Sequence, residues 1–373
     1  MNDSARTAFN ATPIVFPDGT IATWAGASPR PDEFAFGTET GFLRFSFIDR
    51  FIPEEVPSKI VPSSEAINGL AFVERDDYRF LAASTRAELV VHRHANDGRH
   101  IGYALHEGGA HGVHATAWGG FLAPLGRAGL VSISPGQSGD LRQSILSGNN
   151  GVPYFYKLAS LGLKGNREVW IAAGRTDGLI AVFLGKDGEI DWGRALQSRN
   201  QPVDFVGVCS IGTPEYPLAA ASLGRDRSLR LSFDALADHR PVTLVFPEMQ
   251  GTAYKVLSCM GHVFIHTKSY LYIFKEMASR FLQGESLAGL NPVHYIRTNY
   301  FDFNIAYDRL LLLNHQGINV IPMGDLDLMG VATQSDAGST NTVQTDFDWE
   351  PNESMNLVRS ESSLLVESDL HLV

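Results

Sequence analysis

The chain has 373 residues, of which 44% are hydrophobic and 19% charged, and its formal net charge is −11. This hydrophobic fraction can fill a large core, whereas the acidic balance disfavours general nucleic-acid binding. No run approaches the 18 apolar residues of a membrane-spanning helix, the first residues lack the pattern of a secretory signal, and two cysteines are too few for a disulfide framework. We therefore expect a cytoplasmic protein that makes no contact with membranes.

One local pattern recurs along the chain: a short apolar run, a turn of about four residues, and a second apolar run. β-branched and aromatic residues flank turns built from Gly, Asp, Asn and Ser, which is the pattern of a β-hairpin. The predicted hairpins lie at 34–47, 80–92, 121–134, 169–183, 218–233, 262–274 and 310–321.

The spacing of these hairpins indicates the architecture. Equivalent turn positions are 41 to 50 residues apart, which leaves room for two more strands in each interval. Seven four-stranded units of about 46 residues predict an all-β fold, a seven-bladed β-propeller of antiparallel blades. A two-sheet sandwich is the rival, but it would not explain the even spacing.

Two segments depart from the repeat. Residues 13–16 (PIVF) precede the first hairpin, and we expect them to form a strand that completes blade seven and closes the ring. After the sixth hairpin, Met277, Phe281 and Leu282 recur at helical spacing. They predict a short helix near 276–290, inserted between the third and fourth strands of blade six.

Three segments resemble the WD-repeat propellers. Residues 219–233 (AAASLGRDRSLRLSF) match that family's Ser-x-Gly-x-Asp-x-Thr-x-Arg-Leu-Trp pattern, and 66–85 (AINGLAFVERDDYRFLAAST) resemble its strand–turn–strand segment. Residues 111–126 (HGVHATAWGGFLAPLG) resemble its His-containing entry to a blade. The resemblance is thus strongest in blades two, three and five. It supports the architecture, whereas a shared fold does not fix a function.

The resemblance also implies a structural network. Asp226 occupies the place of the family's hairpin aspartate, which accepts hydrogen bonds from a buried His and a hydroxyl. Ser222 is expected to supply the hydroxyl, and His111 matches the family's structural His ahead of blade three. No His precedes blade five at the expected place, so the network there is expected to be partial.

The sequence shows no motif of known catalytic chemistry. It has no GxSxG elbow, Walker-type loop or Cys/His zinc spacing. His92 and His94 alternate on one strand, as a metal pair can, but no carboxylate-rich loop lies near them. We expect no metal and no other cofactor. The expected inner strands carry four charged residues, Lys157, Asp204, Lys255 and Asp302.

These inner-strand charges follow no repeated acidic or His position, so we do not expect an enzyme. The alternative is a propeller enzyme that acts on a small molecule in the central channel. Clustered carboxylates, histidines or a bound metal around the channel would favour that alternative.

The hairpin turns carry a base in every blade except the first, which has Glu39; the seventh has His315. Because all these turns emerge on one face of a propeller, an acidic protein would display a basic ring there. Arg and Lys in this ring suit carboxylate or phosphate groups, although exposed cations can also merely solvate a surface. The expected partner-binding residues are Arg86, Arg127, Arg175, Arg225, Arg227 and Lys268.

The sequence therefore predicts a non-catalytic platform for protein–protein interaction, a scaffold or a sensor or regulatory subunit of a larger complex. Its partner would present an acidic or phosphorylated segment. We expect residues 1–330 to form the propeller and 331–373, with eight acidic residues against Arg359, to form an acidic Ser/Thr/Asn-rich extension. That extension would fold back over the basic ring and compete with the partner. Its alternatives are a solvated linker or docking elsewhere.

Overall fold

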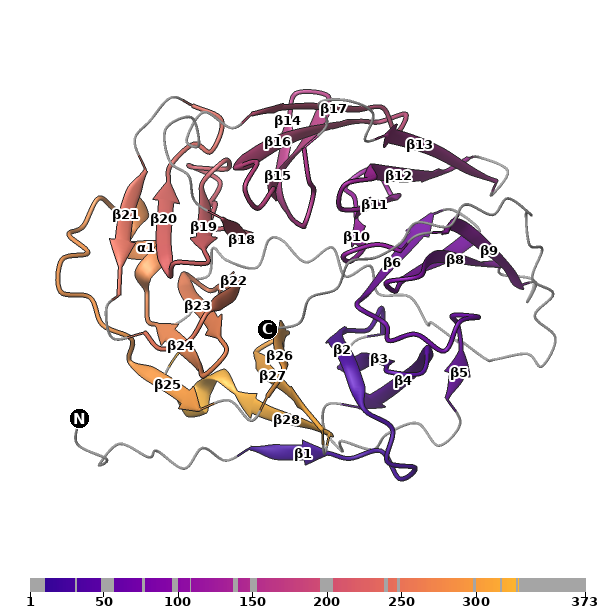
Figure 1. Ribbon diagram of the computed structural model, residues 1–373, viewed down its shortest axis with the longest axis horizontal. Helices are drawn as coiled ribbons and strands as arrows, with labels where there is room; N and C mark the ends of the chain where they lie inside the picture. Colours follow the sequence, from indigo (N-terminus) through magenta and orange to yellow (C-terminus); the bar gives the residue numbers. More distant parts are fainter. Residues whose placement is uncertain are drawn as a thin grey trace.

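The computed structural model describes residues 11–30, 32–47, 57–75, 78–95, 100–107, 109–136, 140–147, 153–194, 204–237, 241–246, 249–297, 300–315, 317–326 and 328. Within these ranges the chain forms seven four-stranded antiparallel sheets arranged around a central axis (Figure 1). The protein is thus a seven-bladed β-propeller, which confirms the fold expected from the hairpin spacing.

In blades one to six the four strands follow one another along the chain, from the axis outward (Figure 1). The strands of blades one to three are β2 (Ala22–Ala27), β3 (Glu33–Thr38), β4 (Phe42–Phe47), β5 (Ser58–Lys59), β6 (Gly69–Arg75), β7 (Tyr78–Ser84), β8 (Glu88–Ala95), β9 (His100–Glu107), β10 (His114–Ala115), β11 (Phe121–Pro124), β12 (Gly129–Pro135) and β13 (Leu141–Ser147). The strands of blades four to six are β14 (Lys157–Lys164), β15 (Arg167–Ala173), β16 (Leu179–Gly185), β17 (Ile190–Arg194), β18 (Phe205–Ser210), β19 (Ala220–Gly224), β20 (Ser228–Ser232), β21 (Val242–Val245), β22 (Ala253–Cys259), β23 (His262–Thr267), β24 (Tyr270–Phe274) and β25 (His294–Arg297).

Blade seven joins the two ends of the propeller. Its first three strands are β26 (Asp302–Ala306), β27 (Arg309–Asn314) and β28 (Gly317–Pro322). The fourth is β1 (Thr12–Ile14), which pairs antiparallel with β28, with Thr12 opposite Val320. The prediction that the PIVF segment closes the ring is confirmed, with the strand beginning one residue earlier.

The core is divided among the interfaces between neighbouring blades. The second and third strands of each blade are buried on both faces, as the near-continuous burial of β15 and β20 shows. Strands of this kind appear in the sequence as unbroken apolar runs rather than strict alternation. The described residues form seven apolar clusters; the largest, between blades five and six, includes Val263, Phe274 and Phe281.

Two short helices lie near the end of the propeller. Helix α1 (Met277–Leu282) follows β24 and packs its apolar side chains, Met277, Ala278, Phe281 and Leu282, into the core between blades five and six. It ends where Gly284 adopts a positive φ of 73°, a left-handed conformation that glycine accepts readily. The helix predicted between the third and fourth strands of blade six is therefore confirmed. A 3-10 helix, η2 (Met323–Leu326), follows β28.

Each blade has the same strand order, so the turns between second and third strands all emerge on one face, which we call the hairpin-turn face. The turns between first and second strands lie on the opposite face. Leu328, the last described residue, lies on that opposite face, because its carbonyl oxygen accepts a 2.7 Å hydrogen bond from Nε2 of His262 at the start of β23. The expected extension 331–373 lies outside the described residues. Neither helix of the described segments is long and apolar enough to cross a membrane.

Candidate functional site

The hairpin-turn face holds all six expected partner-binding residues, and they differ in exposure. Arg86, Arg127, Arg225 and Lys268 are exposed, and Arg175 and Arg227 are partly buried. Both partly buried residues adopt a left-handed backbone, with φ of 49° and 71°. The turns therefore bring the six residues to one side of the molecule, but they do not place them in equivalent surroundings.

In blades five to seven, basic side chains bind groups of the protein itself. Arg225 Nε lies 2.9 Å from Asp204 Oδ2, at the entry to blade five. Arg227 donates a hydrogen bond from its guanidinium to the carbonyl oxygen of Met249. Lys255, on the inner strand β22, lies 2.9 Å from Asp302 Oδ1 on the inner strand of blade seven. We call Arg225, Arg227 and Lys255 the compensated sector.

Blades three and four instead bring together a group that we call the basic-aromatic cluster: His111, Tyr154, Tyr156, Lys157 and Arg175. The guanidinium carbon of Arg175 lies 4.6 Å from the centre of the Tyr156 ring and 5.4 Å from that of Tyr154. Lys157 Nζ lies 5.3 Å from the centre of the same Tyr156 ring. Both cations thus lie within cation–π distance of the same tyrosine ring, and this attraction contributes to their placement.

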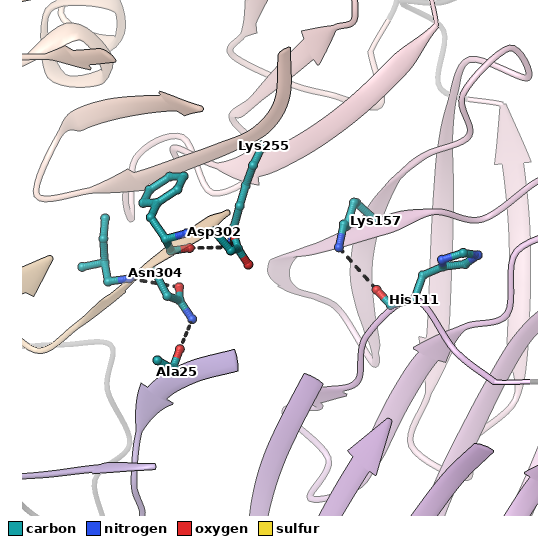
Figure 2. A network of polar contacts seen from close by, with 8 residues as sticks. Ala25, His111, Lys157, Lys255, Asp302 and Asn304 are labelled. Carbon is teal, nitrogen blue, oxygen red and sulfur yellow. Dashed lines mark hydrogen bonds and ion pairs between the residues drawn. The ribbon is translucent and has the colours of Figure 1, made fainter. Parts of the chain in front are cut away.

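His111 links this cluster to blade three. Its Nε2 lies 3.0 Å from the Tyr154 hydroxyl, and its carbonyl oxygen lies 3.5 Å from Lys157 Nζ. Figure 2 shows Lys157 reaching toward His111 on one side of the axis, with Lys255 and Asp302 on the other side. The cluster therefore spans the junction of two blades at the inner edge of the hairpin-turn face.

The local backbone explains why these rings meet. Phe155 bridges Gly126, with amide-to-carbonyl distances of 3.0 and 3.1 Å in the two directions, and its side chain is fully buried. Its neighbours Tyr154 and Tyr156 therefore point away from the core. Gly126 has a φ of +65°, and a Cβ there would lie 2.9 Å from His111 Nε2. Only glycine permits both this backbone and the close approach of the His111 ring.

The cluster is electropositive. Burial, together with the smaller effects of the charges on Lys157, Arg175 and Arg86, lowers the pKa of His111 to about 4. Burial also lowers the pKa of Lys157, an effect that the negative charge of Asp302 partly opposes. Among the described residues, the ion pairs include none made by Lys157, Arg175 or the exposed Arg86 and Arg127 on the neighbouring turns.

The residues expected to form a structural network, Asp226, Ser222 and His111, make other contacts or none. Asp226 Oδ1 accepts hydrogen bonds from the amide (3.1 Å) and hydroxyl (2.6 Å) of Ser228, two residues later in the same turn. The hydroxyl of Ser222 is buried and has no hydrogen-bond partner among the described residues. His111 binds Tyr154 at the junction of blades three and four. In this structure the aspartate thus stabilises its own turn rather than bonding to Ser222.

The polar groups near the axis mostly bind one another. Asp302 Oδ1 also accepts the Phe303 amide at 2.8 Å, and Asn304 Nδ2 donates to the Ala25 carbonyl oxygen at 2.6 Å, which joins blade seven to blade one (Figure 2). His266 is buried beside Tyr254 and Phe303, and neither ring nitrogen has a hydrogen-bond partner among the described residues.

Of the two histidines considered as metal ligands, only His92 has a described side chain. His92 is buried, and its Nε2 lies 2.6 Å from the Ile60 carbonyl oxygen. The side chain of His94 lies outside the described part. Within the described ranges, no three His, Cys, Asp or Glu side chains gather as a metal ion would require.

These observations define a seven-bladed β-propeller. No protein-family model and no curated protein sequence matches the chain. Among solved structures, the chain is similar to a catalytically inactive virginiamycin B lyase from Staphylococcus aureus crystallised with quinupristin, with a TM-score of 0.57, 10% identity, and 84% of this chain and 99% of that chain covered.

Two further β-propeller domains are similar to nearly the same extent. The Cps50 (Swd1) β-propeller domain from Myceliophteria thermophila has a TM-score of 0.55 and 12% identity, with 80% of this chain and 95% of that chain covered. The WD40 β-propeller domain of Doa1 has a TM-score of 0.53 and 8% identity, with 81% and 96% covered. At such identities the likeness extends to the fold alone.

Proposed function

We propose that the protein is a non-catalytic platform for protein–protein interaction, a scaffold or a sensor or regulatory subunit of a larger complex, which binds its partner with the hairpin-turn face. The observation that carries this proposal is the group of four cations in blades two to four, Arg86, Arg127, Lys157 and Arg175, none of which forms an ion pair among the described residues.

Charge and solvation favour a partner over a merely solvated surface. Arg86 and Arg127 are exposed, and water can solvate them at little cost. Lys157 and Arg175 are partly buried, and a charge removed from water is unfavourable unless it is paired. An acidic or phosphorylated segment of a protein partner would supply the missing charge, and Arg forks suit its carboxylate or phosphate groups.

The comparisons are compatible with this role and keep an alternative open. WD-repeat propellers are typically protein-interaction scaffolds, whereas the lyase has the same fold and is an enzyme. The inner-strand groups here, Lys255 with Asp302 and Asn304 with Ala25, hold adjacent blades together. Because these groups are engaged in bonds between blades, we favour the platform over an enzyme with its site at the axis.

The proposal includes the organisation of the chain. Residues 1–330 would be the propeller, and 331–373 an acidic extension that competes for the basic face. Since Leu328 lies on the opposite face, the extension would have to pass the rim or the axis to reach the hairpin turns. A cytoplasmic location and the absence of general nucleic-acid binding belong to the same proposal.

The test is affinity purification from the native host followed by mass spectrometry, with three forms of the full chain. One is the wild type, one carries Arg86→Glu with Arg127→Glu, and the control carries Lys164→Glu with Lys186→Glu. The control residues are exposed and lie on turns of the opposite face. The control therefore makes the same change in net charge away from the proposed surface.

We expect the same partner with the wild type and the control, and at least tenfold less of it with the Arg86/Arg127 variant. Recovery should also fall with rising salt, because exposed charges are screened. Recovery of the chain alone under gentle conditions, or equal recovery with both variants, would contradict the proposal.

A further inference from the structure

We propose that the basic-aromatic cluster is a phosphate subsite, which binds the phosphate group of a phosphorylated residue in the protein partner. Arg175 and Lys157 would contact the phosphate, and Arg86 and Arg127 would surround it at longer range. This inference rests on the proposed function, because it names what one part of the hairpin-turn face recognises.

The first argument for this subsite comes from the surroundings of Lys157. Its side chain is partly buried at the start of the inner strand β14. Its ammonium donates a hydrogen bond to the His111 carbonyl oxygen, and this contact is long, at 3.5 Å. Asp302 attracts it only from across the axis, and that carboxylate already binds Lys255 at 2.9 Å. A partly buried ammonium with so little compensation is unfavourable. An anion bound at this position would remove the imbalance.

Arg175 supplies a preorganised fork. Its guanidinium lies over the rings of Tyr154 and Tyr156, and its backbone is held in the turn by a 3.2 Å hydrogen bond from the Phe205 amide to its carbonyl oxygen. A stacked guanidinium has lost much of its freedom before a ligand arrives, so less entropy is lost on binding. Its Nε is buried and has no hydrogen-bond partner among the described residues, so the guanidinium is not fully satisfied in this structure.

The electrostatic field at the cluster also favours a bound anion. Lys157, Arg175 and Arg86 all disfavour a proton on His111, so their potentials converge on this ring. Arg127 acts on the neighbouring Tyr154. A field that repels a proton attracts an anion, and here it is focused at one point of a protein whose net charge is −11.

The number of cations favours phosphate over carboxylate. One carboxylate carries a single charge, which Lys157 or Arg175 alone would neutralise. A phosphate monoester carries about −1.5 to −2 charges and three strong acceptor oxygens, so it can engage an ammonium and a bidentate guanidinium together. Four cations from three adjacent blades match this higher charge.

The experiment measures binding of fluorescein-labelled peptide libraries to the full chain. Each library has a fixed central residue, which is phosphoserine, serine or glutamate. Lys157→Met keeps the length of the side chain without its charge, and Arg175→Lys keeps the charge without the fork. Lys164→Gln and Lys186→Gln, two exposed residues at turns of the opposite face, serve as controls. Thermal unfolding of every variant establishes that it is folded.

We expect the wild type to bind the phosphoserine library at least tenfold more tightly than the serine and glutamate libraries. Lys157→Met should lose at least tenfold of that affinity while unfolding at the same or a higher temperature, and Arg175→Lys should lose about threefold or more. Both controls should bind as the wild type does. Equal affinity for the three libraries, or unchanged binding by Lys157→Met, would overturn the subsite.

Two further measurements distinguish a phosphorylated protein segment from a free anion and from an unphosphorylated partner. Inorganic phosphate, measured by calorimetry, should bind far more weakly than the phosphopeptides; equal affinity would indicate a free anion as the ligand and overturn the proposal. Phosphatase treatment of the native partner should reduce its capture at least tenfold. If capture persists after phosphatase but is lost with Arg86→Glu and Arg127→Glu, the phosphate subsite is refuted while the interaction platform stands.

Discussion

Two sectors of the hairpin-turn face carry basic side chains of the same kinds, yet their surroundings are opposite. In the compensated sector, Arg225 meets Asp204 and Lys255 meets Asp302. In the basic-aromatic cluster, Lys157 and Arg175 meet tyrosine rings and a carbonyl oxygen. Basic residues in the turns therefore do not by themselves define a binding surface.

The difference arises at the beginning of the inner strands. Blade seven begins its inner strand with Asp302, and Asp204 immediately precedes that of blade five. Blade four begins its inner strand with Lys157. An acidic residue at the start of an inner strand neutralises a nearby basic side chain of its own or the adjacent blade. A basic residue at the same place instead adds to the positive charge. The identity of one inner-strand residue thus decides which sector remains available to an anion.

The largest effect should come from disrupting the cluster at its backbone. Gly126→Ala places a Cβ 2.9 Å from His111 Nε2 at a φ of +65°. We expect a loss of about 3 kcal/mol in the free energy of unfolding, measured with urea. Gly165→Ala is the matched control, since it has the same φ and no atom within 4 Å of the added Cβ. It should lose about 1 kcal/mol, and an equal loss in both variants would contradict the packing argument.

Removing the carboxylate that pairs with Lys255, between blades six and seven, should have the next largest effect on stability. Asp302→Asn leaves Lys255 without its carboxylate, and we expect the free energy of unfolding to fall by about 1–2 kcal/mol. Asp308→Asn removes the partner of Arg309 in a pair on the opposite face, and it should lose less than about 1 kcal/mol. Urea midpoints of the two variants, compared with the wild type, test this order.

Acid should destabilise the interface of blades six and seven through His266. Burial lowers the pKa of His266, Asp302 partly opposes this effect and Lys255 adds to it, and the resulting pKa is about 4. Between that value and the ordinary pKa near 6.5, the unfolded chain binds more protons than the folded chain, so stability falls as pH decreases.

His266→Phe removes this contribution. The slope of unfolding free energy against pH between 6.5 and 4 should become shallower by up to about 1.4 kcal/mol per pH unit. At pH 7.5 His266 is neutral in both the folded and the unfolded chain. The difference in unfolding free energy between the wild type and His266→Phe at that pH therefore measures the change in packing alone. Parallel curves for the wild type and the variant would show that His266 does not titrate in this way.

The smallest effects should follow from the exposed turn residues. Arg225→Ala breaks a pair whose arginine side chain is 50% exposed, and we expect a loss between about 0 and 1 kcal/mol. Arg86→Ala removes an exposed charge and should change stability by less than about 0.5 kcal/mol. Thermal unfolding at low and high salt would distinguish them, because only the Arg225 effect should diminish with salt.

The sequence was sufficient to predict the fold because the relevant signals are local. Apolar runs and turn residues define each hairpin, and helical spacing around Phe281 predicts α1. The closing strand was predicted from the space that the repeat leaves before the first hairpin. The hairpins and α1 depend on residues close in the chain, so no tertiary contact had to be known to predict them.

The surroundings of the candidate site could not be predicted in the same way. The expected bond between Ser222 and Asp226 was transferred from a family pattern, but Ser228, two residues after the aspartate, satisfies it within the turn. Tyr154 and Tyr156 directly precede the inner strand of blade four, and only the pairing of Phe155 with Gly126 in the structure shows that they lie beside Arg175. The alternating aromatic run from Tyr154 to Tyr156 was the available signal.

Closure of blade seven has a consequence for how the protein folds. β1 pairs with β28 across roughly three hundred residues of chain, and Asn304 bonds to Ala25 across a similar distance. Contacts this distant in the chain form slowly, because a long loop must close before they contribute. Until then the outer edge of β28 is unpaired, and the first strand of another molecule can occupy it. Refolding at high concentration should therefore yield strand-exchanged oligomers joined through blade seven, whose fraction rises with protein concentration.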